Sequence, residues 1–193
     1  KVNERYQAQV ITTGGMGALP FRDGMSATGF PSGVRGGPIE IFESMSTVIV
    51  WKKEYRVDSC GAGRMRGGLG QAIEMENGID EPFYFNCSVE RVKFAARGYE
   101  KGLAGSPGFV GLASGGSLPG KGRHLIPQGE RVVILSPGGG GIGDPRERDP
   151  ASVERDLANG LISTAIVRDV YGLPSKGPKA APARKDKVLE PRD

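Results

Sequence analysis

Short stretches of alternating or β-branched residues dominate the middle of the chain. Alternation of apolar and polar positions, with β-branched and aromatic residues, is typical of half-buried strands. Several short strands at turn-sized spacing favour a sandwich or barrel-like layer over alternating βαβ units. The expected strands, separated by Gly, Pro or Asn, lie at residues 39–43, 47–51, 73–76, 83–87, 91–94 and 131–135.

After residue 148 the pattern becomes helical, with apolar positions three and four residues apart. Asp149 can cap a first helix that has Pro150 at its first position. Ser163 can cap a second helix, which Gly172 and the proline after it end. These signals predict a helical hairpin packed on the β layer.

Glycine and proline shape the rest of the chain: 32 Gly and 14 Pro make up about a quarter of its 193 residues. Leu, Ile, Val and Phe reach about 23%, which is enough for a folded core because the floor is roughly 20%. Residues 1–38 carry too many breakers for a helix and are expected to form long, packed loops. The sequence thus predicts an α+β fold over residues 1–175, and a disordered Lys/Pro/Ala-rich tail over 176–193.

Charge and composition exclude several classes of function. The formal net charge is +4, but the segment 176–193 holds six Lys/Arg against three Asp/Glu, so the rest is close to neutral. That balance argues against binding of nucleic acid. No apolar run approaches the roughly 18 residues that a membrane-spanning helix needs. One His and two Cys without a CxxC spacing cannot build a His/Cys metal site. We expect a reducing, cytoplasmic setting.

The first candidate site is a breaker-rich loop with a cation, a carboxylate and a hydroxyl: Arg22, Asp23 and Ser26, with Arg35 nearby. Such a loop could orient a polar substrate through a bidentate guanidinium contact. The same residues could instead pair locally and stabilise irregular backbone. No base stands near Ser26, so we do not expect it to be a nucleophile.

The second candidate is the glycine-rich run 136–145, which contains the spacing GxGxxG directly after an expected strand. Glycines would let backbone N–H groups approach an anion. However, Asp144-Pro145 stands where a dinucleotide fold needs a helix, and no βαβ unit surrounds it. An anion-binding or substrate-facing loop and a tight turn into the helices both remain open. The candidate substrate-facing residues here are Gly139, Gly140, Gly141 and Asp144.

For three further residue types, a structural role is expected rather than a catalytic or ligand-binding one. Arg64 and Arg66 could bind phosphate or carboxylate, but bonding to carbonyls or carboxylates within a connection between strands fits better. Cys60 has no neighbouring base and is expected to be a small buried hydrophobe. His124 lies in a turn before a strand and is expected to be solvated or hydrogen-bonded.

Taken in order, these glycine-rich strings carry a family resemblance. The strings are 14–17, 22–36, 58–59, 61–64, 66–70, 121–122, 137–141, 143–145, 149–150, 160–163 and 171–172. Over residues 10–173 the chain resembles the C-terminal portion of the hydantoinase B / 5-oxoprolinase family.

The resemblance implies part of the B subunit of an ATP-dependent enzyme that opens cyclic amides of the hydantoin, 5-oxoproline or lactam type. In such enzymes an actin-like ATPase A subunit activates the carbonyl by phosphorylation. The metal ligands that the family carries in its B subunit are His and Asp residues nearer the N terminus. ATP and a divalent metal are therefore expected in the whole complex, and neither is expected to be bound by this chain alone.

The chain begins at Lys1 rather than Met, which favours a piece of something longer. We expect it to act only with the N-terminal part of the subunit and the A subunit, on a small cyclic amide. Two alternatives stay open. One is a subunit of an ATP-dependent ketone carboxylase, and the other is a non-catalytic structural module of such a complex.

Overall fold

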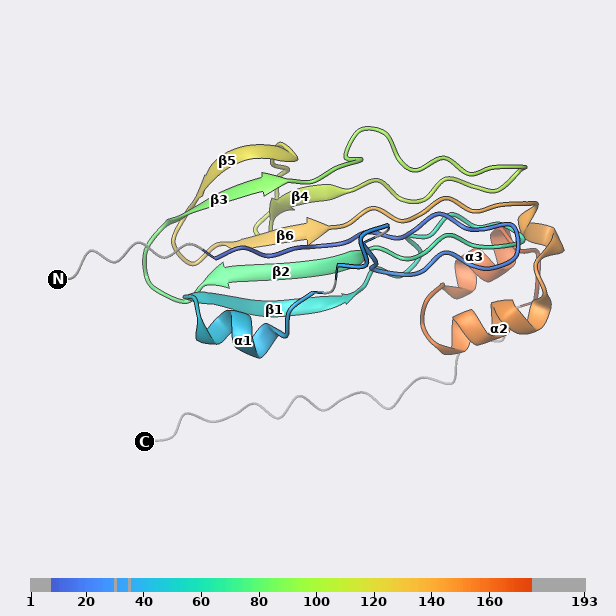
Figure 1. The fold of residues 1–193 in the computed structure, drawn as a ribbon, viewed down its shortest axis with the longest axis horizontal. Helices are drawn as coiled ribbons and strands as arrows, with labels where there is room; N and C mark the ends of the chain where they lie inside the picture. Colours follow the sequence, from blue (N-terminus) through green and yellow to red (C-terminus); the bar gives the residue numbers. More distant parts are fainter. Residues whose placement is uncertain (1–7, 30, 35, 175–193) are drawn as a thin grey trace.

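Two antiparallel sheets form one end of the molecule in the computed structural model, which describes residues 8–29, 31–34 and 36–174. A four-stranded sheet has the order β1-β2-β6-β4, and a two-stranded sheet pairs β3 with β5 (Figure 1). The strands are β1 (Val48–Tyr55), β2 (Gln71–Asn77), β3 (Phe83–Ser88), β4 (Phe109–Leu112), β5 (Lys121–Ile126) and β6 (Arg131–Leu135).

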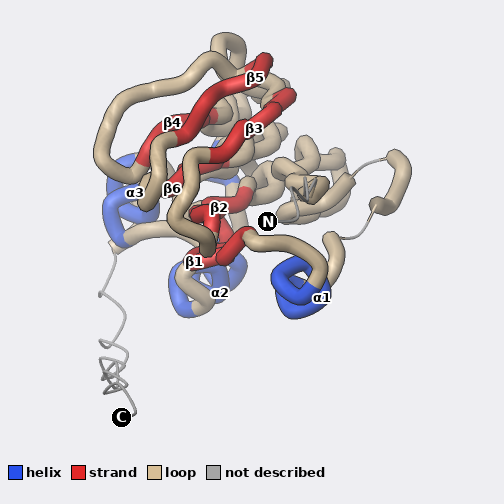
Figure 2. Tube along the Cα trace, turned by 90° about the vertical axis from the view of Figure 1, so that its left-hand side faces the viewer, coloured by secondary structure: helices blue, strands red, loops and turns tan. Residues whose placement is uncertain are grey.

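The main apolar core lies where the two sheets face each other. In the larger sheet Ile73 pairs with Ile134 and Met75 with Val132, so one face carries a continuous apolar patch. Ile126 of β5 is fully buried against it. Figure 2 shows β3 and β5 lying over the larger sheet. The α+β class and the β-rich layer predicted from the sequence are thus confirmed.

Four expected strands are present, at 47–51, 73–76, 83–87 and 131–135. The expected strand at 39–43 is wrong, because α1 (Ile39–Ser44) occupies it. Ile39 and Phe42, three residues apart, are half-buried beside β1, so one turn of helix places both on the same side. Five residues are too few to distinguish the two-residue period of a strand from the 3.6-residue period of a helix.

The expected strand at 91–94 is also absent. Arg91 has a φ of 57°, in the left-handed region that interrupts a strand. The sequence-based prediction missed β4 and β5, since β4 has only four residues and β5 begins with the polar, glycine-containing run Lys121-Gly122-Arg123. β4 and β5 are stabilised by ladder hydrogen bonds to β6 and β3, respectively, rather than by the strand propensity of their own residues.

Extended glycine-rich segments continue away from the sheets and lie side by side (Figure 1). We call them the glycine-rich layer, which comprises residues 14–28, 58–70, 96–108 and 136–143. Backbone hydrogen bonds join them, including those from Gly15 N to Pro137 O (2.9 Å) and from Gly139 N to Gly68 O (2.9 Å). Residues 136–143 are thus an extended, buried part of this layer rather than a tight turn.

The layer depends on the missing side chains of its glycines. A Cβ built on Gly139 would lie 2.0 Å from Met16 O, and one on Gly67 would lie 2.0 Å from Gly139 O. Both contacts are with backbone, which cannot rotate away. Neighbouring segments can therefore approach this closely only where the residue that faces the neighbouring carbonyl has no Cβ.

The helical hairpin is confirmed, but it covers the glycine-rich layer rather than the strands (Figure 1). After a 3₁₀ turn at Pro145–Glu147, the hairpin consists of α2 (Pro150–Ala158) and α3 (Thr164–Asp169). Asp149 and Ser163 cap the two helices as expected, each accepting from backbone N–H groups of the first turn. The buried apolar residues of this second core are Ala62, Val153, Ile162, Val167 and Tyr171.

The expected tail at 176–193 lies outside the described residues, so the boundary near 175 remains a prediction. None of the helices in the part of the chain that the structure describes has the length and apolar content needed to cross a bilayer.

Replacing Gly139 by Ala tests the packing of the layer. We expect Gly139→Ala to lower the free energy of unfolding by about 3 kcal/mol, because the new methyl group meets fixed backbone. Urea unfolding and soluble yield measure the loss. Gly37→Ala is the control, since its Cβ would have nothing within 4 Å. Similar stabilities for the two variants would show that the layer is not closely packed.

Candidate functional site

A buried network of two arginines and two aspartates ties the helical hairpin to the glycine-rich layer. The side chains of Arg66, Arg148 and Asp156 are 9%, 2% and 5% exposed. Arg148 Nη1 and Nη2 each donate to one carboxylate oxygen of Asp23 at 2.7 Å, and Nη2 also donates to Asp156 at 2.8 Å. Arg66 Nε donates to the same Asp156 oxygen at 2.9 Å. The four charges balance, so the cluster is neutral as a whole.

The network holds Asp23 and Arg148 in their charged forms. Burial raises the pKa of Asp23, but the hydrogen bonds and charge of Arg148, with help from Arg66, outweigh it and leave that pKa below its usual value. Burial likewise lowers the pKa of Arg148, yet the pair with Asp23 leaves it above its usual value. Neither group exchanges a proton near neutral pH. The network is therefore built to hold structure rather than to move protons.

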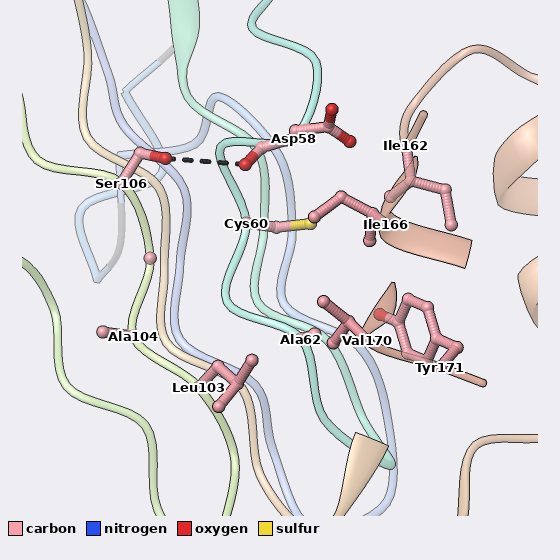
Figure 3. Close-up of a pocket in the computed structure, with 11 residues that line it drawn as sticks. Asp58, Cys60, Ala62, Leu103, Ala104, Ser106, Ile162, Ile166, Val170 and Tyr171 are labelled. Carbon is pink, nitrogen blue, oxygen red and sulfur yellow. Dashed lines mark hydrogen bonds between the residues drawn. The ribbon is translucent and has the colours of Figure 1, made fainter. Parts of the chain in front are cut away.

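A cavity of about 170 Å³ opens beside this network, between the glycine-rich layer and α3 (Figure 3). Burial raises the pKa of the Cys60 thiol to about 11, although the positive charge of Arg66 lowers it in part. The thiol is thus protonated at neutral pH and a poor nucleophile. The residues that line the cavity are Asp58, Cys60, Ala62, Leu103, Ala104, Gly105, Ser106, Ile162, Ile166, Val170 and Tyr171.

The first candidate loop is mostly engaged in structural contacts. Asp23 belongs to the ion network and also accepts from the backbone N–H of Arg66 (2.8 Å). Ser26 Oγ accepts from Leu69 N (3.0 Å), which joins two segments of the layer. Arg22 differs, because it lies exposed at a tight turn, and its side chain has no hydrogen bond or ion pair within the described residues. Arg35 lies outside the described residues.

The second candidate loop likewise has a structural role, in the glycine-rich layer and the turn that follows it. Gly139, Gly140 and Gly141 are buried, and their carbonyls accept from Gly61, Ala18 and Tyr99 in turn. Asp144 caps the 3₁₀ turn by accepting from Arg146 N at 3.0 Å. The structure places both candidate loops in one packed layer, on either side of residues 66–69: Gly24 N donates to Arg66 O, and Gly139 N donates to Gly68 O.

The sequence-based prediction missed Arg148 and Asp156, the two most buried charges of the network. A signal was available. Asp156 stands three residues after Val153, on the face of α2 that is buried, and a buried carboxylate needs a charged or hydrogen-bonding partner. The expectation that Arg66 bonds carbonyls or carboxylates is confirmed, because it donates to Gly67 O and Asp156. His124 is hydrogen-bonded to Pro119 O, again as expected.

Within the described ranges, no group of three or more His, Cys, Asp and Glu side chains is placed to hold a metal ion. The residues present therefore give no metal site through which a reaction step could be drawn. The carboxylates Asp23 and Asp156 are instead neutralised by arginines.

Comparison with known proteins decides the family. The family model for hydantoinase B/oxoprolinase matches residues 1–145. The chain belongs to the hydantoinase B/oxoprolinase family. The resemblance found in the glycine-rich strings is thereby confirmed.

Two of the similar proteins are named as subunits of enzymes. The chain is 32% identical over 189 residues to the beta subunit of the caprolactamase of Pseudomonas jessenii. It is 30% identical over 180 residues to the B subunit of a putative D-/L-hydantoinase of Pseudomonas sp. strain NS671. These matches cover 89% of this chain but only 32% and 30% of the two relatives. The chain thus spans about a third of their length.

Solved structures show the same fold. The crystal structure of the ATP-dependent caprolactamase from Pseudomonas jessenii matches with a TM-score of 0.68 at 31% identity, over 86% of this chain and 30% of that one. The nucleotide-free acetone carboxylase matches with a TM-score of 0.64 at 20% identity, over 84% of this chain and 26% of that one. The second match concerns the fold alone.

The buried network predicts a large loss of stability when one charge is removed. Arg148→Met keeps much of the side-chain volume but removes the bidentate partner of Asp23 and leaves Asp156 with Arg66 alone. We expect the free energy of unfolding to fall by about 3 kcal/mol. Arg168→Met is the control, because Arg168 forms an exposed pair with Asp169 and should change little. Equal effects of the two substitutions would contradict the structural role.

The network also predicts a dependence of stability on acid. The folded-state pKa of Asp23 lies below its unfolded value of about 3.9, so its contribution is complete above that pH and is lost as the pH falls through the folded value. Urea unfolding at pH 6, 4 and 3 should therefore show a falling free energy. Asp23→Asn should flatten this decline, and an unchanged slope would remove Asp23 from the explanation.

Proposed function

We propose that the chain is part of the B subunit of an ATP-dependent amidohydrolase that opens cyclic amides of the hydantoin, 5-oxoproline or lactam type. The observation that carries the proposal is the match to the ATP-dependent caprolactamase in both sequence and fold, over nearly nine-tenths of this chain. The hydantoinase relative supports the same class of reaction.

The chemistry of such an enzyme explains its need for ATP. An amide carbonyl is a poor electrophile, and phosphorylating its oxygen converts that oxygen into a leaving group. A divalent metal, when bound in the whole complex, would activate water for the hydrolytic step. In this proposal ATP and the metal are held outside the present chain, by the N-terminal remainder of the B subunit together with an actin-like ATPase A subunit.

The contribution of this chain is then a rigid frame that presents Arg22 to solvent. The glycine-rich layer and the ion network fix the turn at residues 19–22, on which Arg22 is exposed to solvent. A guanidinium held in this way can bind a carboxylate, a phosphate or a polarised carbonyl. We propose Arg22 and Arg35 as the substrate-facing residues, while Asp23, Ser26, Gly139, Gly140, Gly141 and Asp144 hold the backbone of the layer and of the turn that follows it.

Partner subunits are part of the proposal. Three large apolar side chains, Phe21, Met45 and Phe94, are 75%, 76% and 82% exposed, which is consistent with surfaces that a larger assembly covers. We place the complex in the cytoplasm.

A second candidate function is carboxylation of a ketone. The chain is 29% identical over 200 residues to the acetophenone carboxylase delta subunit of Aromatoleum aromaticum, close to the value for the hydrolases. Both reactions begin by activating a carbonyl compound with ATP, so the same frame could serve either. The third possibility is that the chain braces a complex without touching substrate.

Release of ADP distinguishes the two reactions. The chain is assembled with the N-terminal part of its subunit and the ATPase partner, and ADP is followed with hydantoins, 5-oxoproline and lactams, and separately with ketones plus bicarbonate. We expect a cyclic amide to stimulate ADP release. Stimulation only by a ketone with bicarbonate would assign the chain to a carboxylase instead.

Arg22→Ala separates a substrate-facing role from bracing alone. We expect turnover in the assembled complex to fall about tenfold, the loss typical of one charge-assisted hydrogen bond. Arg97→Ala, which removes another exposed arginine of the glycine-rich layer, is the control. Unchanged turnover in Arg22→Ala, with normal assembly, would support the structural role and remove Arg22 from the site.

A further inference from the structure

The cavity beside α3 has the size of a small ring compound. Its volume is about 170 Å³, and an apolar protein cavity of about 150 Å³ is large enough to bind benzene. Its walls are mainly aliphatic, formed by Leu103 from the glycine-rich layer and by Ile162, Ile166 and Val170 from the helical hairpin (Figure 3). A six- or seven-membered ring can therefore be buried there without displacing charged groups.

One polar group in the wall lacks a partner. Tyr171 is 3% exposed, and its hydroxyl has no hydrogen bond among the residues that the structure describes. Figure 3 shows this oxygen on the side of the ring toward Val170 and Ala62, which also line the cavity. A buried hydroxyl without a partner is costly, and an acceptor atom inside the cavity would relieve that cost. Burial raises the pKa of the Tyr171 hydroxyl and keeps it protonated, so it is a donor.

The charges around the cavity disfavour an anionic ligand. Among its lining residues only Asp58 carries a carboxylate, and one of its oxygens accepts from Ser163 N at 2.7 Å. The nearby guanidinium groups of Arg66 and Arg148 are engaged by Asp23 and Asp156. None of the described residues that line the cavity is a cation able to bind a carboxylate or phosphate. The cavity is thus suited to a neutral molecule with one hydrogen-bond acceptor.

We propose that this cavity binds a small neutral carbonyl compound, with its apolar ring among Leu103, Ile166 and Val170 and its carbonyl oxygen accepting from Tyr171 Oη. Lactams and aryl ketones share this chemistry. The proposal deepens the proposed function and rests on it for the class of substrate. Within that class it selects neutral compounds over 5-oxoproline, whose carboxylate would face Asp58 in an apolar enclosure.

Binding is tested on the assembled complex with ε-caprolactam, acetophenone and 5-oxoproline as probes, by saturation-transfer NMR and calorimetry. We expect saturable binding of caprolactam or acetophenone, and which of the two binds distinguishes the lactam source from the ketone source. Binding of 5-oxoproline in competition with them at this cavity, or no saturable binding of either neutral probe, would overturn the proposal.

Two variants place the bound probe in the cavity. Tyr171→Phe keeps the ring and should weaken binding about fivefold, the effect of one neutral hydrogen bond. Its thermal stability should stay equal or rise, because the deleted hydroxyl has no partner among the described residues. Ile166→Trp fills the space and should abolish binding. Tyr84→Phe, which removes a hydroxyl from an exposed ring on β3, is the matched control. Wild-type affinity in Tyr171→Phe would refute the proposed hydrogen bond.

Alkylation gives a readout independent of turnover. Cys60 lines the cavity, whereas Cys87 lies on β3 with its thiol near the carbonyls of Pro119 and Gly120. A bound neutral probe should slow modification of Cys60 by N-ethylmaleimide and leave Cys87 unchanged. Equal rates at Cys60 with and without the probe would contradict binding in the cavity.

Failure of this proposal is distinct from failure of the proposed function. If a lactam stimulates ADP release but Tyr171→Phe and Ile166→Trp leave its KM unchanged, the hydrolase stands and the cavity site falls. If the probes bind in the cavity but no cyclic amide stimulates ADP release, the cavity site stands and the proposed hydrolase function falls.

Discussion

Backbone packed directly against backbone is the constraint on which the rest of the structure depends. At Gly15, Gly67 and Gly139 a Cβ would come within 2.0 Å or less of a carbonyl group from another segment. Packing of this kind removes side chains from the interior, so hydrogen bonds between main chains replace apolar contacts as the link between segments. The glycines are therefore structural, although their spacing imitates that of a phosphate-binding loop.

The ion network supplies the cohesion that such a layer lacks. A layer made of glycine buries little apolar surface, and the helical hairpin would otherwise rest on it only through the small core around Ala62 and Val153. Arg148 and Arg66 connect that hairpin to two different segments of the layer through Asp23 and Asp156. Because these groups are buried and paired with one another, their geometry fixes how the hairpin sits and hence the shape of the cavity beneath α3.

The features that could be predicted from the sequence are those set by local chemistry. The caps at Asp149 and Ser163, and the apolar strand at 131–135, need only neighbouring residues to be recognised, and the structure contains them. The helix at 39–44 was mistaken for a strand because five residues fit both periods. The partners of Asp23 lie 43 and 125 residues away along the chain, so no local pattern could pair them. The cavity likewise forms only where the hairpin packs on the layer, so the position of Tyr171 in its wall could not be predicted from the sequence.

The order of the segments in the layer has a consequence for how the protein is made. Its four parts come from residues 14–28, 58–70, 96–108 and 136–143, and the last of these hydrogen-bonds to each of the other three. During synthesis the first three segments therefore emerge from the ribosome before the one that joins them. Until residue 143 has been made, the backbone N–H and C=O groups that pair with residues 136–143 stay exposed to solvent and to other chains. Closure of the layer is therefore a late, long-range step that cannot be completed before residue 143 has been made.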